Sequence, residues 1–155
     1  MNFMIRKMRL EDIEQVIAID RLSFSLPWPE RSFRFELTDN PASRCWVAEV
    51  DGKLVGMIVV WLIVDEVHIA TIATHPDFRR QGIAKRLLSH ALRQLSSEGA
   101  QSSFLEVRAS NLAAQEMYRK FGYGESGIRR RYYRDNDEDA ILMTLESLNV
   151  EKLGS

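Results

Sequence analysis

The sequence predicts a single mixed α/β domain, and three observations support this fold class. A chain of 155 residues has the length of one ordinary domain and can bury a core without disulfides. Its content of 45% hydrophobic and 28% charged residues is typical of a globular protein and excludes a disordered one. Segments with helical spacing alternate with β-branched runs, without a repeat, linker or low-complexity segment. We therefore expect one domain over residues 1–155.

The charge balance and the apolar segments narrow the class of protein. The chain has 21 basic and 22 acidic residues, so no overall charge excess indicates nucleic-acid binding. Cys45 is the only cysteine, which excludes an internal disulfide and agrees with a reducing compartment. The first ten residues lack the apolar core of a secretory signal, and the longest apolar run, residues 55–64, is too short to cross a bilayer as a helix. We expect a cytoplasmic protein that binds neither a membrane nor nucleic acid.

The first forty residues predict two helices joined by a loop. Between Glu11 and Phe24 apolar residues recur at helical spacing, and acidic residues lie in the first turn, where the helix dipole favours them. Pro29 fits the first turn of a shorter second helix, which ends before Pro41. The segment Leu26-Pro27-Trp28 interrupts the helical pattern and is expected to form the loop.

The rest of the chain predicts a strand-rich segment followed by alternating helices and strands. Runs of β-branched and aromatic residues predict the strands, which are expected at residues 45–50, 54–64, 67–74, 102–108, 128–133 and 140–145. The first three form a meander, with a turn at Asp51-Gly52. Two further helices are expected, one from Gly82 to near Gly99 and one from Asn111 to Phe121, closed by Gly122.

The segment from His75 to Ala84 has the composition of a phosphate-binding turn between a strand and a helix. Such a turn presents several backbone N–H groups in one direction, and the helix dipole adds positive charge, which suits a pyrophosphate. Gly82 lets the backbone approach the phosphates, and Ala84 keeps the first helical turn clear. The segment lacks the Lys-Ser/Thr ending of a P-loop and the three glycines of a dinucleotide fingerprint. An ordinary loop with a helix cap is the alternative.

A second segment, from Leu105 to Tyr123, offers groups suited to acid–base chemistry. In a strand, Glu106 lies on the face opposite Leu105, so its carboxylate is presented on one face of an otherwise apolar strand. Asn111 can cap the N-terminus of the next helix. Tyr118 lies two turns into that helix, where a tyrosine taken by itself is more often a core residue.

These motifs resemble those of a known family. The spacing Arg79-x-x-Gly82-x-Ala84 is similar to the acetyl-CoA signature of the GNAT superfamily of N-acetyltransferases. The run from Leu105 to Asn111, the helix ending in Phe121-Gly122-Tyr123 and the later segment from Ile128 to Ala140 resemble RimI-type ribosomal-protein alanine N-acetyltransferases over nearly the whole chain. The resemblance implies a mixed, mostly antiparallel central sheet that is splayed into a V near Thr74 and flanked by helices.

The resemblance also implies roles for individual residues. Glu106 corresponds to the general base and Tyr118 to the general acid. The residues implied to hold acetyl-CoA are Ile72, Ala73, Thr74, Arg79, Arg80, Gln81, Gly82, Ile83, Ala84, Lys85, Asn111 and Tyr118. The acceptor groove is implied to lie between Leu26, Pro27 and Trp28 on one side and Tyr132 and Tyr133 on the other, although these residues equally suit the core or the rim. Ala84 replaces a glycine common in the bacterial enzymes, which stays within the family pattern.

The implied residues suit acetyl transfer to an amine. The reaction needs a neutral nitrogen, stabilisation of an oxyanion and a proton for the leaving thiolate. A protein α-amine has a pKa of about 8 and a lysine amine about 10.4, so near neutral pH roughly a few hundred times more of the α-amine is neutral. We therefore expect a protein N-terminus as acceptor, with an alanine-initiated ribosomal protein as the first candidate. Direct transfer in a ternary complex is expected, because Cys45 lacks the partner of a nucleophilic cysteine.

Three alternatives accompany this hypothesis. The first is the same chemistry on a lysine side chain, a polyamine or an antibiotic. The second is a noncatalytic acyl-CoA sensor or RNA-binding module, suggested by the arginines at 129–131 and opposed by the acidic residues at 135–139 that nearly cancel their charge. The third, metal catalysis, has little support, because His68, His75 and His90 lack ligand spacing. We expect no metal site. His68 lies on the strand that leads to the cofactor site, and we expect it to be packed or exposed, with a position facing the cleft as the alternative.

Overall fold

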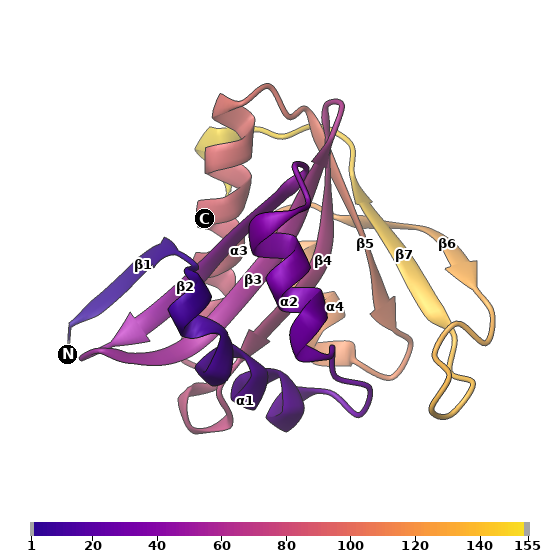
Figure 1. The fold of residues 1–155 in the computed structure, drawn as a ribbon. Coiled ribbons are helices and arrows are strands. Elements are labelled where there is room, and N and C mark those ends of the chain that lie inside the picture. The colour runs from indigo at the N-terminus through magenta and orange to yellow at the C-terminus, as the bar shows by residue number, and fades with distance from the viewer. Residues whose placement is uncertain (1, 154–155) are drawn as a thin grey trace. The chain divides into compact units, whose positions relative to one another are not determined.

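The computed structural model describes residues 2–153 and confirms the mixed α/β class (Figure 1). Its strands are β1 (Phe3–Lys7), β2 (Ser43–Val50), β3 (Lys53–Ile63), β4 (Glu66–Thr74), β5 (Ser102–Arg108), β6 (Gly124–Arg129) and β7 (Ala140–Leu145). Its α-helices are α1 (Ile13–Ser23), α2 (Glu30–Thr38), α3 (Ile83–Ser97) and α4 (Leu112–Phe121). The strands follow the order β1-β2-β3-β4-β5-β7-β6 in one sheet. The pairs β1–β2, β2–β3, β5–β7 and β6–β7 are antiparallel, whereas β4 pairs with β5 in parallel.

Two elements differ from the sequence-based expectation. Strand β1 was not predicted, because its five residues mix charged and apolar side chains, and it pairs along its whole length with β2. The strand expected at residues 128–133 was placed wrongly, because β6 begins at Gly124 and ends at Arg129. Its pairing with β7 contains an irregularity between Glu125 and Gly127, which lets a glycine-rich segment of low strand propensity join the sheet.

The chain forms two compact units, and residues 2–61 and 70–91 make up the first. Strand β3 is buried along most of its length in this unit, which explains its continuous apolar run. Met57 and Val59 belong to a core cluster with residues of α1 and α2, including Val16 and Phe33. Gly56, one residue along the strand, faces α3 instead. Both faces of β3 are therefore covered by helices.

The second unit contains residues 62–69 and 92–153. Burial alternates along β5, with Leu105 and Val107 in the core and Glu106 only partly buried. This confirms the predicted parity of the strand. Among residues 2–153, no helix has both the length and the apolar character needed to cross a membrane. The single domain expected over residues 1–155 and the V-shaped opening of the sheet stay predictions.

Candidate active site

In the first unit, the N-terminus of α3 offers free backbone donors. Gly82 has a φ of 77°, a conformation that favours glycine, and its carbonyl accepts from the N–H of Arg86 at 3.0 Å. The three preceding amides of the helix, at Ile83, Ala84 and Lys85, have no backbone acceptor among the described residues, as expected for the first turn of a helix. These amides are thus available to an external anion.

Helix α4 of the second unit shows the opposite arrangement at its N-terminus. The side chain of Asn111 accepts a hydrogen bond from the N–H of Ala114 at 3.2 Å. This confirms the predicted capping role of Asn111. Because the cap already satisfies one amide, α4 leaves fewer donors for a ligand than α3 does.

The position of α3 depends on a close approach at Gly56 of β3. A Cβ at Gly56 would lie 2.9 Å from Ile83 Cγ2, 3.0 Å from Leu87 Cδ1 and 3.2 Å from the carbonyl oxygen of Ala73. The absence of a side chain therefore lets the first turns of α3 pack directly on β3 and β4. This contact could not be predicted from local sequence patterns, since it depends on how a distant helix packs on the strands.

The end of β4 carries an unsatisfied polar atom in the predicted cofactor strand. The hydroxyl of Thr74 is buried and has no hydrogen-bond partner among the described residues. Buried hydroxyls are normally satisfied, and such an exception often marks the place of a missing ligand or water. The carbonyl of Thr74 accepts from Arg79 Nε at 3.4 Å, which ties the start of the loop to the strand.

The predicted acceptor loop at Leu26, Pro27 and Trp28 is hydrogen-bonded to α1. The backbone N–H of Trp28 donates to Asp20 Oδ2 at 2.7 Å, and the Trp28 ring contacts Phe33 with ring centroids 5.1 Å apart. Burial raises the pKa of Asp20 to about 6, against the hydrogen bond from Trp28, which lowers it. Leu26 remains 49% exposed, as expected for a residue at the rim of a binding surface.

In the second unit, Glu106 meets a partner that the sequence did not predict. His68 Nε2 lies 2.7 Å from Glu106 Oε2. Burial alone would raise the pKa of Glu106, but the hydrogen bond and charge of His68 and the charge of Arg129 outweigh it, so the pKa lies below its usual value. Glu106 is therefore an ionised carboxylate near neutral pH. His68 is packed against Phe104, as expected, and in addition it contacts the carboxylate of Glu106.

Tyr118 of α4 is buried and keeps its proton. Burial is the largest cause that raises the pKa of its phenol, and nearby Tyr133 adds to it. Its ring packs edge-on against Tyr123 with centroids 5.5 Å apart. The hydroxyl of Tyr123 donates to Ser103 at 2.7 Å, whereas the Tyr118 hydroxyl has no hydrogen-bond partner among the described residues. Only Tyr118 of this pair has a phenolic proton free for a ligand.

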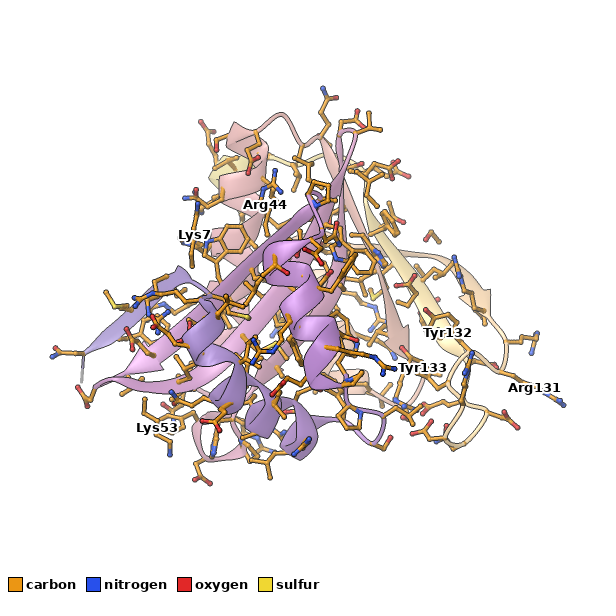
Figure 2. The ribbon with its side chains drawn as sticks, viewed as in Figure 1. Lys7, Arg44, Lys53, Arg131, Tyr132 and Tyr133 are labelled. Carbon is orange, nitrogen blue, oxygen red and sulfur yellow. The ribbon has the colours of Figure 1, made fainter. Side chains whose placement is uncertain are left out.

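The loop between β6 and β7 carries Tyr132 and Tyr133, which differ in how far they are buried. Figure 2 shows both on this loop, with Arg131 extending away from it. Tyr133 lies under the guanidinium of Arg108, 4.0 Å from the ring centroid, and its pKa is raised to about 12, chiefly by burial. The charge of Glu106 also raises the pKa of Tyr133, and Tyr133 in turn raises the pKa of Tyr118. Tyr132 is 43% exposed.

Arg108 holds this loop through two acidic residues. Its guanidinium bonds to Asp135 at 2.9 Å and to Glu138 at 3.3 Å. Glu138 also accepts from the N–H of Ser110 at 2.6 Å, and its backbone carbonyl accepts from the N–H of Tyr133 at 3.1 Å. The acidic residues that follow the arginine cluster therefore have structural partners, and the loop is fixed to β5 rather than free.

The predicted site residues are thus divided between the two units. The first unit holds the loop at residues 26–28, the strand at 72–74 and the turn at 79–85. The second unit holds Glu106 on β5, Tyr118 on α4, Tyr132 and Tyr133 on the loop between β6 and β7, and Asn111 at the start of α4. Within residues 2–153 there is no cluster of side chains suited to holding a metal ion.

Comparison with known proteins identifies relatives over nearly the full length. The family model described as "Acetyltransferase (GNAT) family" matches residues 13–123. A Bacillus subtilis protein with a provisional name as a ribosomal protein bS18-alanine N-acetyltransferase is 42% identical, with 90% of this chain and 92% of that protein aligned. The Escherichia coli protein named as the same enzyme is 34% identical, with 91% of this chain and 95% of that protein aligned.

Solved structures agree with these matches. The crystal structure of the ribosomal-protein-S18-alanine N-acetyltransferase from Escherichia coli has a TM-score of 0.87 and 32% identity, and the alignment covers 96% of each chain. Ard1 from Thermoplasma volcanium has a TM-score of 0.86 and 26% identity over 96% of this chain and all of that one. The chain therefore belongs to the GNAT acetyltransferase family.

Proposed function

We propose that this chain transfers the acetyl group of acetyl-CoA to the N-terminal α-amino group of a protein, and that the acceptor is an alanine-initiated ribosomal protein. The observation that carries the proposal is that the second unit holds one ionised carboxylate that is partly buried and one protonated phenol that is buried. Glu106 is ionised and can accept a proton, whereas Tyr118 is protonated and can donate one. Relatives named for acetylation of alanine in ribosomal protein bS18 support the class of acceptor.

Acetyl-CoA fits the residues of the first unit. The amides that begin α3 and the open space around Gly82 suit a diphosphate. The unsatisfied hydroxyl of Thr74 offers a polar partner at the end of the neighbouring strand. The exposed guanidinium groups of Arg79 and Arg80 add positive charge beside the same turn. When bound, acetyl-CoA supplies an activated acyl group as a thioester.

The proposed reaction forms a carbon–nitrogen bond, breaks a carbon–sulfur bond and moves protons through Glu106 and Tyr118. Glu106 accepts a proton from the acceptor ammonium, directly or through water, and the neutral nitrogen forms a bond to the acetyl carbon. Backbone N–H groups of β4 near Ala73 stabilise the negative charge that develops on the carbonyl oxygen. The carbon–sulfur bond then breaks, and the thiolate takes the phenolic proton of Tyr118. The nitrogen of the adduct loses its remaining excess proton as the amide forms, and this proton returns through water to the Tyr118 phenolate. Burial keeps the phenol protonated until the sulfur leaves.

The test is acetylation of a defined peptide panel. The protein is incubated with acetyl-CoA and peptides that carry both a free N-terminus and an internal lysine, beginning with alanine or with other residues. We expect mass spectrometry to locate the acetyl group on the α-nitrogen, with alanine-initiated peptides modified fastest. Acetylation of lysine alone would contradict the proposed acceptor and favour the lysine or small-amine alternative.

Three variants test the assigned roles. Glu106→Gln and Tyr118→Phe should each lower kcat by about a hundredfold or more while the Kd for CoA changes little. Tyr123→Phe is the matched control, because it removes the hydroxyl of the other buried tyrosine, which bonds to Ser103. It should lower stability and leave kcat near that of the unmodified protein. Near-normal turnover in the first two variants would remove both catalytic assignments.

A further inference from the structure

The contact between His68 and Glu106 joins two neighbouring strands. In the parallel pairing of β4 with β5, His68 lies opposite Phe104, so Glu106 follows two residues later on the same face of β5. The side chains of His68 and Glu106 are 16% and 12% exposed, and their nitrogen and oxygen atoms are 2.7 Å apart. The pair is therefore partly shielded from water, which strengthens a charge-assisted hydrogen bond.

A second contact fixes the orientation of the imidazole. The ring of His68 stacks on the ring of Phe104, with centroids 4.5 Å apart and planes inclined by 6°. Phe104 and Glu106 project from the same face of β5, so one strand supplies both the surface for the ring and the acceptor for its nitrogen. Because the stacking sets the plane and the hydrogen bond sets the rotation, His68 has little freedom to turn away from Glu106.

The direction of the hydrogen bond follows from the charge of Glu106. An ionised carboxylate can only accept, so Nε2 of His68 must carry the proton. Glu106 Oε2 is occupied by this bond, and no other described side chain donates to the carboxylate. The second oxygen, Oε1, thus remains for a proton from the acceptor.

We propose that His68 is a positioning residue for the general base, in which its Nε2–H donates to Glu106 Oε2 and orients Oε1 toward the acceptor amine. The proposal rests on the function proposed above and adds a residue to its machinery. One proton of the acceptor ammonium passes to Oε1, and the nitrogen bonds to the acetyl carbon. The carbon–sulfur bond breaks, the sulfur leaves with the proton of Tyr118, and the excess proton on the nitrogen returns through water to the Tyr118 phenolate. His68 keeps its own proton throughout and acts only through Glu106.

Several charged and titratable groups near Glu106 can also shift its pKa. His68 and Glu66 approach from β4, Arg129 from β6 and Tyr133 from the loop between β6 and β7. A cavity of about 200 Å³ beside Glu106 is lined by Glu66, Arg129 and Ser126 among others, and offers room for water. Of these groups, only His68 forms a hydrogen bond to the carboxylate within the described residues, so its removal is expected to dominate.

Two substitutions separate the hydrogen bond from the packing. His68→Phe keeps an aromatic ring that can stack on Phe104 but removes the donor. His68→Gln keeps a side-chain N–H that can reach the same oxygen. We expect kcat to fall about tenfold or more in His68→Phe and to recover most of that loss in His68→Gln, with unchanged Kd for CoA in both. The acidic limb of the pH profile of kcat/KM should move to higher pH in His68→Phe.

A measurement on the free protein tests the pair without the reaction. Carbon-detected NMR of the Glu106 carboxyl should show a pKa about one unit or more higher in His68→Phe than in the unmodified protein, with His68→Gln between them. Equal Glu106 titration and equal kcat in all three proteins would overturn the proposal. If instead the unmodified protein acetylated no N-terminus while the titration moved as expected, the proposed function would fail and the contact would stand.

Discussion

Gly82 provides a test of the phosphate-binding turn that separates binding from folding. A residue with a Cβ costs about 1–2 kcal/mol in the left-handed region that Gly82 occupies. An added Cβ would meet no atom within 4 Å, so the cost is backbone strain and not a clash. Since the turn is exposed, Gly82→Ala can relax in the free protein, and the strain returns when a ligand demands the original conformation. CoA affinity should therefore fall about 5- to 30-fold.

Gly52 is the matched control, because it also has a positive φ of 85° and no atom within 4 Å of an added Cβ. It lies in the turn between β2 and β3, whose ladders prevent relaxation. Gly52→Ala should thus lower the free energy of unfolding by about 1–2 kcal/mol without changing CoA affinity. Calorimetry with CoA and urea unfolding of both variants provide the comparison. Unchanged CoA affinity in Gly82→Ala would refute the reasoning.

The remaining predictions concern the loop supports and the cysteine. Arg108→Ala should release Tyr133 and raise KM for the acceptor peptide about tenfold, while the Kd for CoA is retained; an unchanged KM would contradict this. Because burial raises the pKa of Asp20 to about 6, above its unfolded value, its contribution of up to about 3 kcal/mol is present in acid and lost as pH rises through about 4 to 6. Urea unfolding should show that loss in the unmodified protein and not in Asp20→Asn, whose amide oxygen still accepts from Trp28. Burial raises the pKa of Cys45 to about 11, so Cys45→Ala should keep turnover within about twofold, and abolished turnover would indicate an acetyl-cysteine intermediate.

The sequence predicted the elements whose signal is local. Helices α1 to α4 follow from apolar spacing, and the ends of α4 follow from Asn111 and Gly122, which cap the helix as expected. Strand β1 could not be predicted in this way, because its three apolar residues are followed by Arg6 and Lys7 without strand periodicity, and it forms a strand only beside β2. The placement of β6 failed for a related reason, since its glycines and polar residues pair through an irregularity that depends on β7.

The same distinction applies to the site. The position of Glu106 on the less buried face of β5 could be predicted, because strand parity is a local property. Its partner His68 could not, because their contact depends on the register of β4 with β5. A histidine at a strand position of the matching parity was the only available signal. Likewise, Arg108 lies within the run from Leu105 to Asn111, but its contact with Tyr133 depends on the pairing of β7 with β5 and could not be predicted.

The close packing of α3 on Gly56 affects which substitutions can change the position of the helix. Three atoms within 3.2 Å of an added Cβ set the depth at which the helix sits on its strands. Residues of the neighbouring loop can then vary without shifting where the helix begins. A side chain added at position 56 would displace the first turns of α3 and with them the amides that we propose bind the coenzyme, whereas substitutions in the exposed loop at residues 79–82 would leave the helix in place.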